Sequence, residues 1–577
     1  MLSLLKQRGV ALLDRSRKFG WVDLLVVVGL AGCLFGLVDL AREWRGVMRP
    51  TIAISLSPWA LPQYTFFSLT RGLLAYTLSL AFTLVYGYWA AKDRVAEHVL
   101  IPLLDILQSI PVLGFMPGLV LALVGMFPSS NVGLELAAVL MIFTGQAWNM
   151  TFSFYHSLRS VPHDQREVSV VYRFNWWQRL KSVELPFSAI GLVWNSMMSM
   201  AGGWFFLMIN ESFVLGKKDF RIPGVGSYMS VAVAAGDTSA MIWAIISMTA
   251  MIVLLDQLLW RPVVVWAQKF RVEEGGQQEA MSSFFLNWLR RSRIVARVSR
   301  ILEALKTETV YKAVPLQAKP NRVAASPKWA STLSLVFFLL LLSTLSIGAY
   351  RLVLVLKGVD ASEWRMITVA ALWTLGRVLL ATTLGTLWAL PAGIAIGLSS
   401  RLSRMLQPVV QVVASFPAPM LFPVVIAGLK LAGIPLGWGS IVLMLLGTQW
   451  YILFNVIAGA MAIPSDLKEA AQSYRMTRLQ RFWKVYVPAV FPYVVTGWVT
   501  AAGGAWNASI VAEYVTFKGE VLAAWGLGAQ ISRAAERADF PALAASVLIM
   551  SAMVVVFNRT VWRRCYRLAE EKFSLSK

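Results

Sequence analysis

The feature that most constrains this chain is a series of long apolar segments. A helix needs roughly 20 mainly apolar residues to cross about 30 Å of hydrocarbon, and backbone in lipid must be helical because no water satisfies its polar groups. Only 14% of the 577 residues are charged, against about 25% in soluble domains. We therefore expect an all-α polytopic membrane protein. The twelve expected spans lie near 21–41, 68–91, 101–126, 133–155, 187–213 and 240–265, and then near 331–350, 370–399, 405–430, 437–461, 489–515 and 542–560.

Basic residues set the expected orientation of these spans. With the N-terminus inside, the inside segments hold 38 of the 53 Lys and Arg residues, which is the positive excess typical of cytoplasmic loops. Both termini are therefore predicted to be cytoplasmic. The net charge of +23 is spread along one membrane face, so nucleic acid is not an expected partner. The three histidines lack metal-ligand spacing and the two cysteines cannot build a disulfide framework, so no metal site is expected.

The second half of the chain repeats the first. At a constant offset of 302 residues, matching residues run from Gly145 and Gly447 to Asp237 and Asp539. Upstream the offset becomes 306, because the first half holds four extra residues near Met126–Val132. Each half has an even number of spans, so the two repeats enter the membrane in the same direction and can form a pathway between them.

This repeat divides the chain into a first six-span repeat at 1–266, a linker at 267–328 and a second repeat at 329–577. The linker is rich in basic residues. Within it, apolar residues recur at helical spacing from Phe284 to Leu305, with arginines between them. The pattern predicts a basic amphipathic helix on the inner leaflet. Binding of a partner, or regulation, is the alternative interpretation of this segment.

In each half, one inside loop follows the fourth span, and the two loops match in sequence. The first reads EVSVVYRFNWWQRLKSVELP from Glu167 to Pro186, and the second reads EAAQSYRMTRLQRFWKVYVP from Glu469 to Pro488. Each predicts a helix with an acid in its first turn, favoured by the helix dipole, and a stop at the proline. Both copies also share a tyrosine followed by an arginine: Tyr172 and Arg173, then Tyr474 and Arg475.

These loops resemble the EAA loop of binding-protein-dependent ABC importer permeases. That family's pattern is Glu-Ala-Ala, three residues, Gly, nine residues and Ile-x-Leu-Pro. The residues at the family spacing are Glu469, Ala470, Ala471, Val485, Val487 and Pro488 in the second copy and Glu167, Val183, Leu185 and Pro186 in the first. The resemblance implies the type I ABC importer transmembrane fold in the bacterial cytoplasmic (inner) membrane. It also implies two ABC ATPase subunits on the cytoplasmic side, which hold ATP and Mg²⁺, and a periplasmic or extracellular substrate-binding protein.

The two inside loops, 167–186 and 469–488, which we call the coupling loops, depart from the family pattern in two ways. The family glycine is Arg173 in the first copy and Arg475 in the second, and Val168 and Ser169 replace the two alanines in the first. In the family this loop forms a short coupling helix that docks on the ATPase. Because the same arginine occurs twice, we hypothesise a charged contact to the ATPase in place of a tight backbone approach.

Other motifs resemble the nitrate, sulfonate and taurine branch of the family over nearly all of both halves. Two prolines begin the third span of each half, at Pro111 and Pro117 and again at Pro417 and Pro423. They would bend helices that line a path. The presence of two halves in one chain resembles the duplicated anion permeases of this group. The resemblance implies a small solute as substrate, such as nitrate, a sulfonate, taurine or bicarbonate.

Ionisable groups near the spans are candidates for the path, because charge is costly in lipid. Arg71 and Arg377 lie at matching places near the outer starts of the second spans, where they could attract an anion or extend to lipid headgroups. Glu211 and Glu513 would repel an anion unless paired, so we predict ion pairs with these arginines, as a gate or a structural link. Further candidates for the path, which packing explains equally well, are Trp148, Asn149, Trp450, Trp204 and Trp506.

No motif for nucleotide hydrolysis is visible in the sequence. A GxxxxGK[ST] phosphate loop is absent, so a separate polypeptide is expected to hydrolyse ATP and no cofactor is expected in this chain. The leading interpretation is a permease, not an enzyme, whose two loops transmit ATPase motion to alternating access. The alternatives are an ion-coupled secondary transporter with two parallel six-helix halves and a membrane scaffold that transports nothing.

Overall fold

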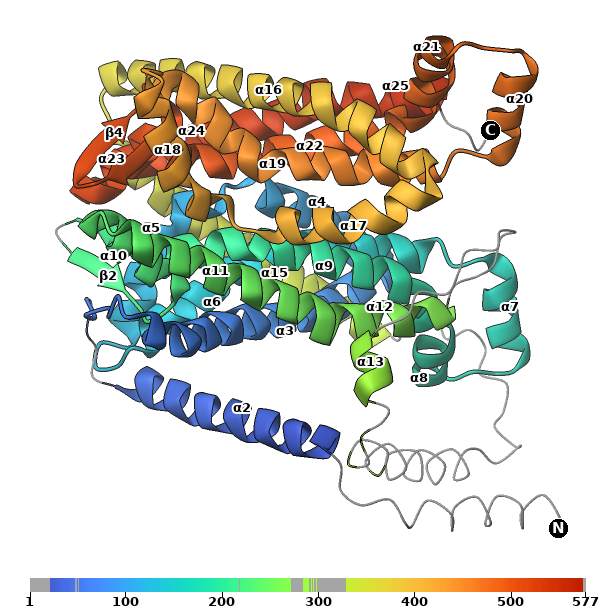
Figure 1. Ribbon diagram of the computed structural model, residues 1–577, viewed down its shortest axis with the longest axis horizontal. Coiled ribbons are helices and arrows are strands. Elements are labelled where there is room, and N and C mark those ends of the chain that lie inside the picture. The colour runs from blue at the N-terminus through green and yellow to red at the C-terminus, as the bar shows by residue number, and fades with distance from the viewer. Residues whose placement is uncertain are drawn as a thin grey trace. The chain divides into compact units, whose positions relative to one another are not determined.

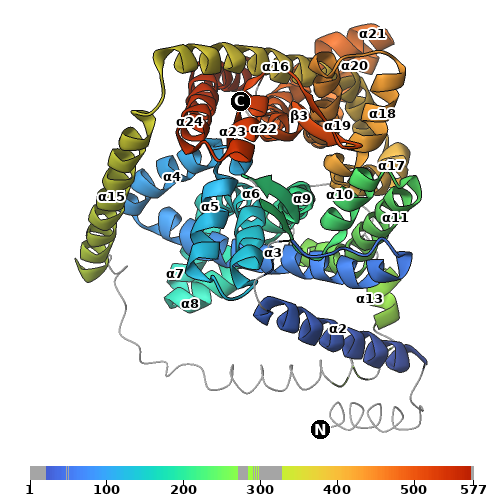
Figure 2. The same ribbon diagram turned by 90° about the vertical axis from the view of Figure 1, so that its left-hand side faces the viewer.

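The computed structural model describes residues 21–46, 49, 51–216, 218–270, 284–289, 292, 294, 297 and 328–573 (Figures 1 and 2). The described residues are almost entirely helical, which confirms the predicted all-α class. The elements of the first half are α2 Trp21–Arg45, η2 Pro58–Ala60, α3 Leu61–Lys92, α4 Arg94–Ser109, α5 Val112–Met126, α6 Val132–Arg159, α7 His163–Val171, α8 Trp176–Arg179, η3 Leu180–Glu184, α9 Leu185–Asn210, β1 Ser212–Leu215, β2 Lys218–Arg221, α10 Val225–Ala235, α11 Thr238–Leu255, η4 Asp256–Trp260, α12 Arg261–Ala267 and η5 Gln268–Phe270.

The second half repeats this order of elements. Its elements, after the linker helix α13 Phe284–Leu289, are α15 Lys328–Leu356, α16 Ala361–Leu398, α17 Ser400–Ser415, η6 Ala418–Leu421, α18 Phe422–Leu431, α19 Leu436–Met461, α20 Ser465–Ser473, α21 Arg478–Arg481, η7 Phe482–Tyr486, α22 Val487–Ala512, β3 Tyr514–Phe517, β4 Glu520–Ala523, α23 Leu527–Arg537, α24 Phe540–Phe557, η8 Asn558–Trp562 and α25 Arg563–Phe573. Of the expected linker helix from Phe284 to Leu305, most lies outside the described residues, as do both chain termini.

The described residues divide into two compact units. The first comprises the described parts of Met1–Glu43, His163–Ile190 and Leu254–Ala325, and the second comprises those of Trp44–Pro162, Gly191–Val253 and Ser326–Lys577. The second unit therefore contains helices from both sequence repeats. This division by spatial contact differs from the division by repeat at residues 266 and 328, which stays a prediction.

Membrane spans match the expected pattern with one exception. Among the described residues, nine helices are long and apolar enough to cross a bilayer, and two bent helix pairs raise the number to eleven. The exception is the predicted span at 133–155, which corresponds to α6. This helix has 28 residues and would be the twelfth span, but polar side chains such as Glu135 and Gln146 interrupt its apolar run.

Both third spans are broken by proline. Helices α4 and α5 meet at 96°, and α17 meets the η6–α18 segment at 81°. Pro111 and Pro417 lie directly at the breaks, where a residue before proline avoids helical geometry and proline offers no N–H. The predicted bends are confirmed. The first N–H of α5, on Val112, donates to Asn507 Oδ1 of α22 at 2.8 Å, so a backbone group freed by the break has a partner in the other repeat.

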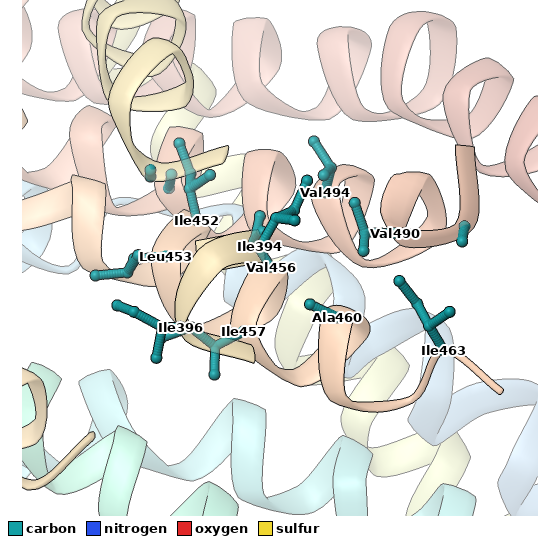
Figure 3. Packing of buried hydrophobic residues seen from close by; sticks show 13 residues of the cluster. Ile394, Ile396, Ile452, Leu453, Val456, Ile457, Ala460, Ile463, Val490 and Val494 are labelled. Carbon is teal, nitrogen blue, oxygen red and sulfur yellow. The ribbon is translucent and has the colours of Figure 1, made fainter. Parts of the chain in front are cut away.

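Helices α16, α19 and α22 form a packed core within the second unit (Figures 1 and 2). Figure 3 shows its buried aliphatic side chains, including Ile394, Val456 and Val494. Gly393 and Gly397 of α16 lie opposite α19, and a Cβ at either position would fall within 2.6 Å of an α19 side chain. The two helices therefore approach closely because these positions lack side chains.

The outer surface of the spans is apolar. In α15, the 18-residue window that qualifies it as a span has no buried residue, and Leu340 is 63% exposed. In α2, Phe35 is 72% exposed. Apolar faces of this extent are unfavourable in water and are stable against lipid chains, in agreement with a multi-pass membrane protein.

The close packing of α16 on α19 predicts opposite effects at two glycines of α16. A Cβ at Gly397 would lie 2.6 Å from Ala460 Cβ and 2.7 Å from the backbone oxygen of Ile457, whereas a Cβ at Gly376 meets nothing within 4 Å. We expect Gly397→Ala to destabilise the fold by about 1–3 kcal/mol. Gly376→Ala is expected to be neutral or to stabilise by up to about 1 kcal/mol, because alanine favours helix. Thermal unfolding of the purified variants in detergent measures both, and equal unfolding temperatures would contradict the packing argument.

Candidate functional site

Each of the two loops predicted to couple to an ATPase, 167–186 and 469–488, contains a short helix that is followed by a left-handed residue. In the first loop α7 ends before Arg173, whose φ is 51°, and in the second α20 ends before Arg475, whose φ is 49°. Few residues other than glycine adopt this backbone conformation. The arginines therefore occupy, in both copies, the conformation for which the family pattern uses glycine.

The hydrogen bonds at these helix ends are the same in both loops. In the first, Arg173 N donates to Val170 O and Phe174 N donates to Ser169 O, each at 2.9 Å. In the second, the corresponding donors are Arg475 N, to Gln472 O at 2.8 Å, and Met476 N, to Ala471 O at 3.2 Å. This pair of bonds is a Schellman cap, in which the residue after the helix takes a positive φ. The local backbone is therefore conserved between the repeats despite different side chains.

The second part of each loop corrects the expectation of one helix that stops at proline. After the turn, α8 and α21 begin with capping boxes built by Asn175 with Gln178 and by Thr477 with Gln480. A π-helical turn then leads directly into α9 or α22. Pro186 and Pro488 follow this π turn, inside the continuous helical runs Trp176–Asn210 and Arg478–Ala512, so neither proline ends its helix.

The loops expose large side chains. Tyr172 and Tyr474 are 71% and 83% exposed, and Trp176 and Leu479 are 59% and 69% exposed. The acids Glu167 and Glu469 are also exposed, as is Ala470, and Glu167 lies 3.1 Å from His163. Ala471 is 3% exposed and packs inward. Each loop therefore presents aromatic and charged groups on its surface.

A second candidate element is a buried cluster around Arg71. Its Nε and Nη2 donate to the two carboxylate oxygens of Glu135 at 2.5 and 2.6 Å. Its Nη1 donates to Glu211 at 2.8 Å and to the backbone oxygen of Pro223 at 2.7 Å. The side chains of Arg71, Glu135 and Glu211 are all 0% exposed. The predicted pairing of Arg71 with Glu211 is confirmed, and Arg71 does not reach an anion or a headgroup in this structure, because its guanidinium is enclosed and each of its three nitrogens donates to a protein oxygen.

The second half contains the matching cluster around Arg377. Its Nη1 donates to Glu513 at 2.7 Å and to the backbone oxygen of Trp525 at 2.9 Å. Its Nε donates to the backbone oxygen of Gly437 at 3.0 Å. Glu513 also accepts from Thr374 Oγ1 at 2.9 Å. The predicted Arg377 to Glu513 pair is confirmed.

Each buried glutamate also caps a helix. Glu211 accepts from the backbone N–H of Gly226 at 2.7 Å, near the start of α10, and Glu513 accepts from Gly528 at 2.9 Å, near the start of α23. The positive end of a helix dipole stabilises such an anion. A Cβ at Gly224 would collide with the Glu211 carboxyl group, which explains the glycine in this turn.

Sequence reasoning missed several members of these clusters. Ser68 donates to Glu211 at 2.6 Å, and Thr374 occupies its place in the second half. Their offset of 306 was a usable signal, because both carry a hydroxyl. Glu135 was missed because the position that matches it in the second half is Gly437.

The aromatic candidates for the path lie in packed surroundings. Trp204 and Trp506 are each 2% exposed, so both are packing residues here. Trp148 is half-buried and its ring contacts Phe82 and Phe143. Trp450 Nε1 donates to a backbone oxygen in its own helix at 2.9 Å. Asn149 is exposed, and its role in a path stays a prediction.

Two β-hairpins follow the buried glutamates. Strands β1 and β2 pair antiparallel, as do β3 and β4. In Figure 1 the hairpin strand β4 and α23 lie at one end of α22, and α20 and α21 lie at the other.

Lys430 Nζ lies 2.6 Å from Glu520 of β4, and this hydrogen bond lowers the pKa of the glutamate. Burial and a hydrogen bond to Glu536 raise the pKa of Tyr514 in β3 to about 12.

The described residues were searched for groups of three or more His, Cys, Asp or Glu side chains that could hold a metal ion. Within these ranges no such group occurs. The cysteines of the described part of the chain, Cys33 and Cys565, are free. The candidate sites are therefore the two coupling loops and the two buried clusters.

Comparison with known proteins gives two matches to one family model within the chain. Residues 83–259 and 381–561, together more than half of the chain, match the model of the binding-protein-dependent transport system inner membrane component. Each match includes one coupling loop and one buried glutamate. The repeat found in the sequence is therefore a duplication of this domain.

By their names, the curated relatives are nitrate, bicarbonate and taurine permease proteins. The nitrate import permease protein of Leptolyngbya laminosa is 32% identical over 148 residues, which is 25% of this chain and 52% of the relative. The bicarbonate transport system permease protein of Synechococcus elongatus is 30% identical over 142 residues, with 25% and 50% covered. The taurine transport system permease protein of Escherichia coli is 26% identical over 177 residues, with 31% and 59% covered. The chain thus spans about half the length of the curated relatives it matches. It belongs to the family of binding-protein-dependent transport system inner membrane components and carries the family domain twice.

Proposed function

We propose that this chain supplies both permease domains of an ATP-driven importer. The observation that carries the proposal is the repeated coupling loop, in which both copies have the same capped helix and the same left-handed arginine. A loop that only connected two spans would not require the same capped helix and left-handed arginine in both repeats. Two copies fit two ABC ATPase subunits on the cytoplasmic side, which would hold ATP and Mg²⁺.

The exposed surface of each loop supports this role. Tyr172, Trp176 and Trp177 lie on the first loop, and each is more than half exposed. The second loop exposes Tyr474 and Leu479. Large apolar groups on a polar loop mark a surface that another protein covers. Charged neighbours such as Glu469 and Arg475 would add orientation through charge-assisted hydrogen bonds.

The buried clusters would act at the other end of the spans. Arg71 with Glu211, and Arg377 with Glu513, tie the second span of each half to the end of the fifth span. Removing one partner of a buried pair costs about 3–5 kcal/mol, because the other charge is left buried. The clusters would therefore keep each half rigid as ATPase closure moves the loops, and the path would open between the halves by alternating access.

The cargo proposed is a small anion or a sulfonate such as taurine, on the basis of the relatives' printed substrates. A periplasmic or extracellular binding protein would deliver it to the side that carries the β-hairpins. The basic excess in the loop segments favours cytoplasmic termini in a bacterial cytoplasmic membrane.

Reversal of loop charge tests the proposal. We expect Glu469→Lys or Arg475→Glu to reduce ATP-dependent uptake at least tenfold in proteoliposomes that contain the co-expressed ATPase, because like charges would oppose docking. Glu167→Lys and Arg173→Glu test the first loop. Arg365→Glu, an exposed reversal at the start of α16, is the control and should retain uptake. Unchanged uptake in all four loop variants, or uptake driven by an ion gradient without ATPase, would overturn the proposal.

The left-handed arginines allow backbone and charge to be tested separately. Arg475→Gly keeps the favoured positive φ and removes the charge, so we expect stability to rise by up to about 1 kcal/mol. Coupling should nevertheless fall if the guanidinium contacts the ATPase. Arg475→Lys keeps the charge and should retain most of the coupling. ATPase activity with and without substrate measures coupling, and full coupling in Arg475→Gly would reject the charged contact.

A further inference from the structure

The two buried clusters differ at one position. Arg71 and Arg377 each donate Nη1 to a buried glutamate and to a backbone oxygen. In the first half, the other edge of the guanidinium, Nε and Nη2, binds the carboxylate of Glu135. At the offset of 302, the residue that matches Glu135 is Gly437. The second half therefore has the same arginine without its second carboxylate.

This difference leaves one nitrogen of Arg377 available. Its Nε donates to the backbone oxygen of Gly437, but within the described ranges Nη2 has no hydrogen-bond acceptor. The Arg377 side chain is only 10% exposed. Nη2 is not among the fully buried side-chain atoms that have no partner, so it lies at the edge of the buried cluster, where a group from outside can meet it.

There is room for a partner beside this nitrogen. A Cβ built on Gly437 would have one neighbour within 4 Å, Nη2 of Arg377 itself, at 3.9 Å. In the first half, the side chain of Glu135 fills the equivalent space. Gly437 is partly exposed and Trp438 is 65% exposed, so the space can be reached from the surface.

We propose that the Nη2 edge of Arg377 binds a small monovalent oxyanion in the space beside Gly437. The first half demonstrates the chemistry, because a carboxylate already occupies the same edge of Arg71. Nitrate, bicarbonate and sulfonates each offer a charged oxygen that can accept a charge-assisted hydrogen bond from Nη2. The net charges of the two clusters also support this proposal. With all groups ionised, the first cluster has one net negative charge and the second has none. One bound monovalent anion makes the two clusters equal.

The position of the Arg377 site within the helix bundle indicates at which stage of transport it would bind an anion. Arg377 bonds to Trp525, next to hairpin β3–β4, and so lies at the end of the bundle opposite the second coupling loop. Helix α22 joins those ends with 26 residues, or about 39 Å. The site would therefore meet an anion before it enters the path. This inference deepens the proposed function, on which the anion's identity as cargo rests; binding itself needs no ATPase.

The test compares Gly437→Glu with Gly437→Ala in the purified full chain in detergent. Sodium nitrate is the probe, and sodium chloride at equal ionic strength is the reference. Glutamate at Gly437 would supply the carboxylate of the first half in the first turn of α19, where the helix dipole favours it. We expect nitrate to raise the unfolding temperature of the wild-type chain and of Gly437→Ala relative to chloride. In Gly437→Glu the apparent nitrate affinity should fall at least tenfold.

A reciprocal variant adds a gain of function. Glu135→Gly removes the carboxylate from the first cluster and should create a second nitrate site, seen as a larger nitrate-dependent shift. Equal nitrate shifts in the wild-type chain and Gly437→Glu would overturn the proposal, as would no shift in the wild-type chain or loss of the shift in Gly437→Ala. If Glu135→Gly does not fold, the two Gly437 variants still test the proposed anion site. Failure of ATPase coupling would leave these binding results unchanged, so the two proposals are tested separately.

Discussion

A carboxylate buried at the end of α9, and again at the end of α22, organises one end of each repeat. Glu211 and Glu513 each receive an arginine, a hydroxyl and a backbone N–H at the start of the next helix. An unpaired charge in a low-dielectric interior is strongly unfavourable. The three segments that supply the donors are therefore held together, and the hairpin between them has a fixed base.

The same requirement, that polar groups be satisfied away from water, explains the broken third spans. Proline removes helical hydrogen bonds in the middle of an apolar segment, and lipid cannot replace them. At the first break, Asn507 from the other repeat accepts the hydrogen bond of Val112. A helix break between two repeats thus becomes a specific contact between them.

Much of the architecture was predictable from local pattern. The length of the apolar segments predicted the spans and the proline pairs predicted the bends, whereas the cost of an unpaired charge predicted the pairing of Arg71 with Glu211. The second carboxylate on Arg71 was not predictable, because Glu135 lies 64 residues away and its counterpart is a glycine. The positive φ of Arg173 and Arg475 was not predicted either. The sequence shows where glycine is replaced, but a positive φ is read only from the hydrogen bonds of the helix end.

The sequence by itself therefore determined the membrane class, the duplication and the two matching loops at 167–186 and 469–488, because these depend on residue type and spacing along the chain. Tertiary structure decided that Arg71 is enclosed rather than available, that Arg377 Nη2 has no acceptor among the described residues, and that the helices continue through Pro186 and Pro488. Those outcomes depend on which groups from distant segments come within hydrogen-bond distance. Burial changes the energy of a charge only once those segments have packed.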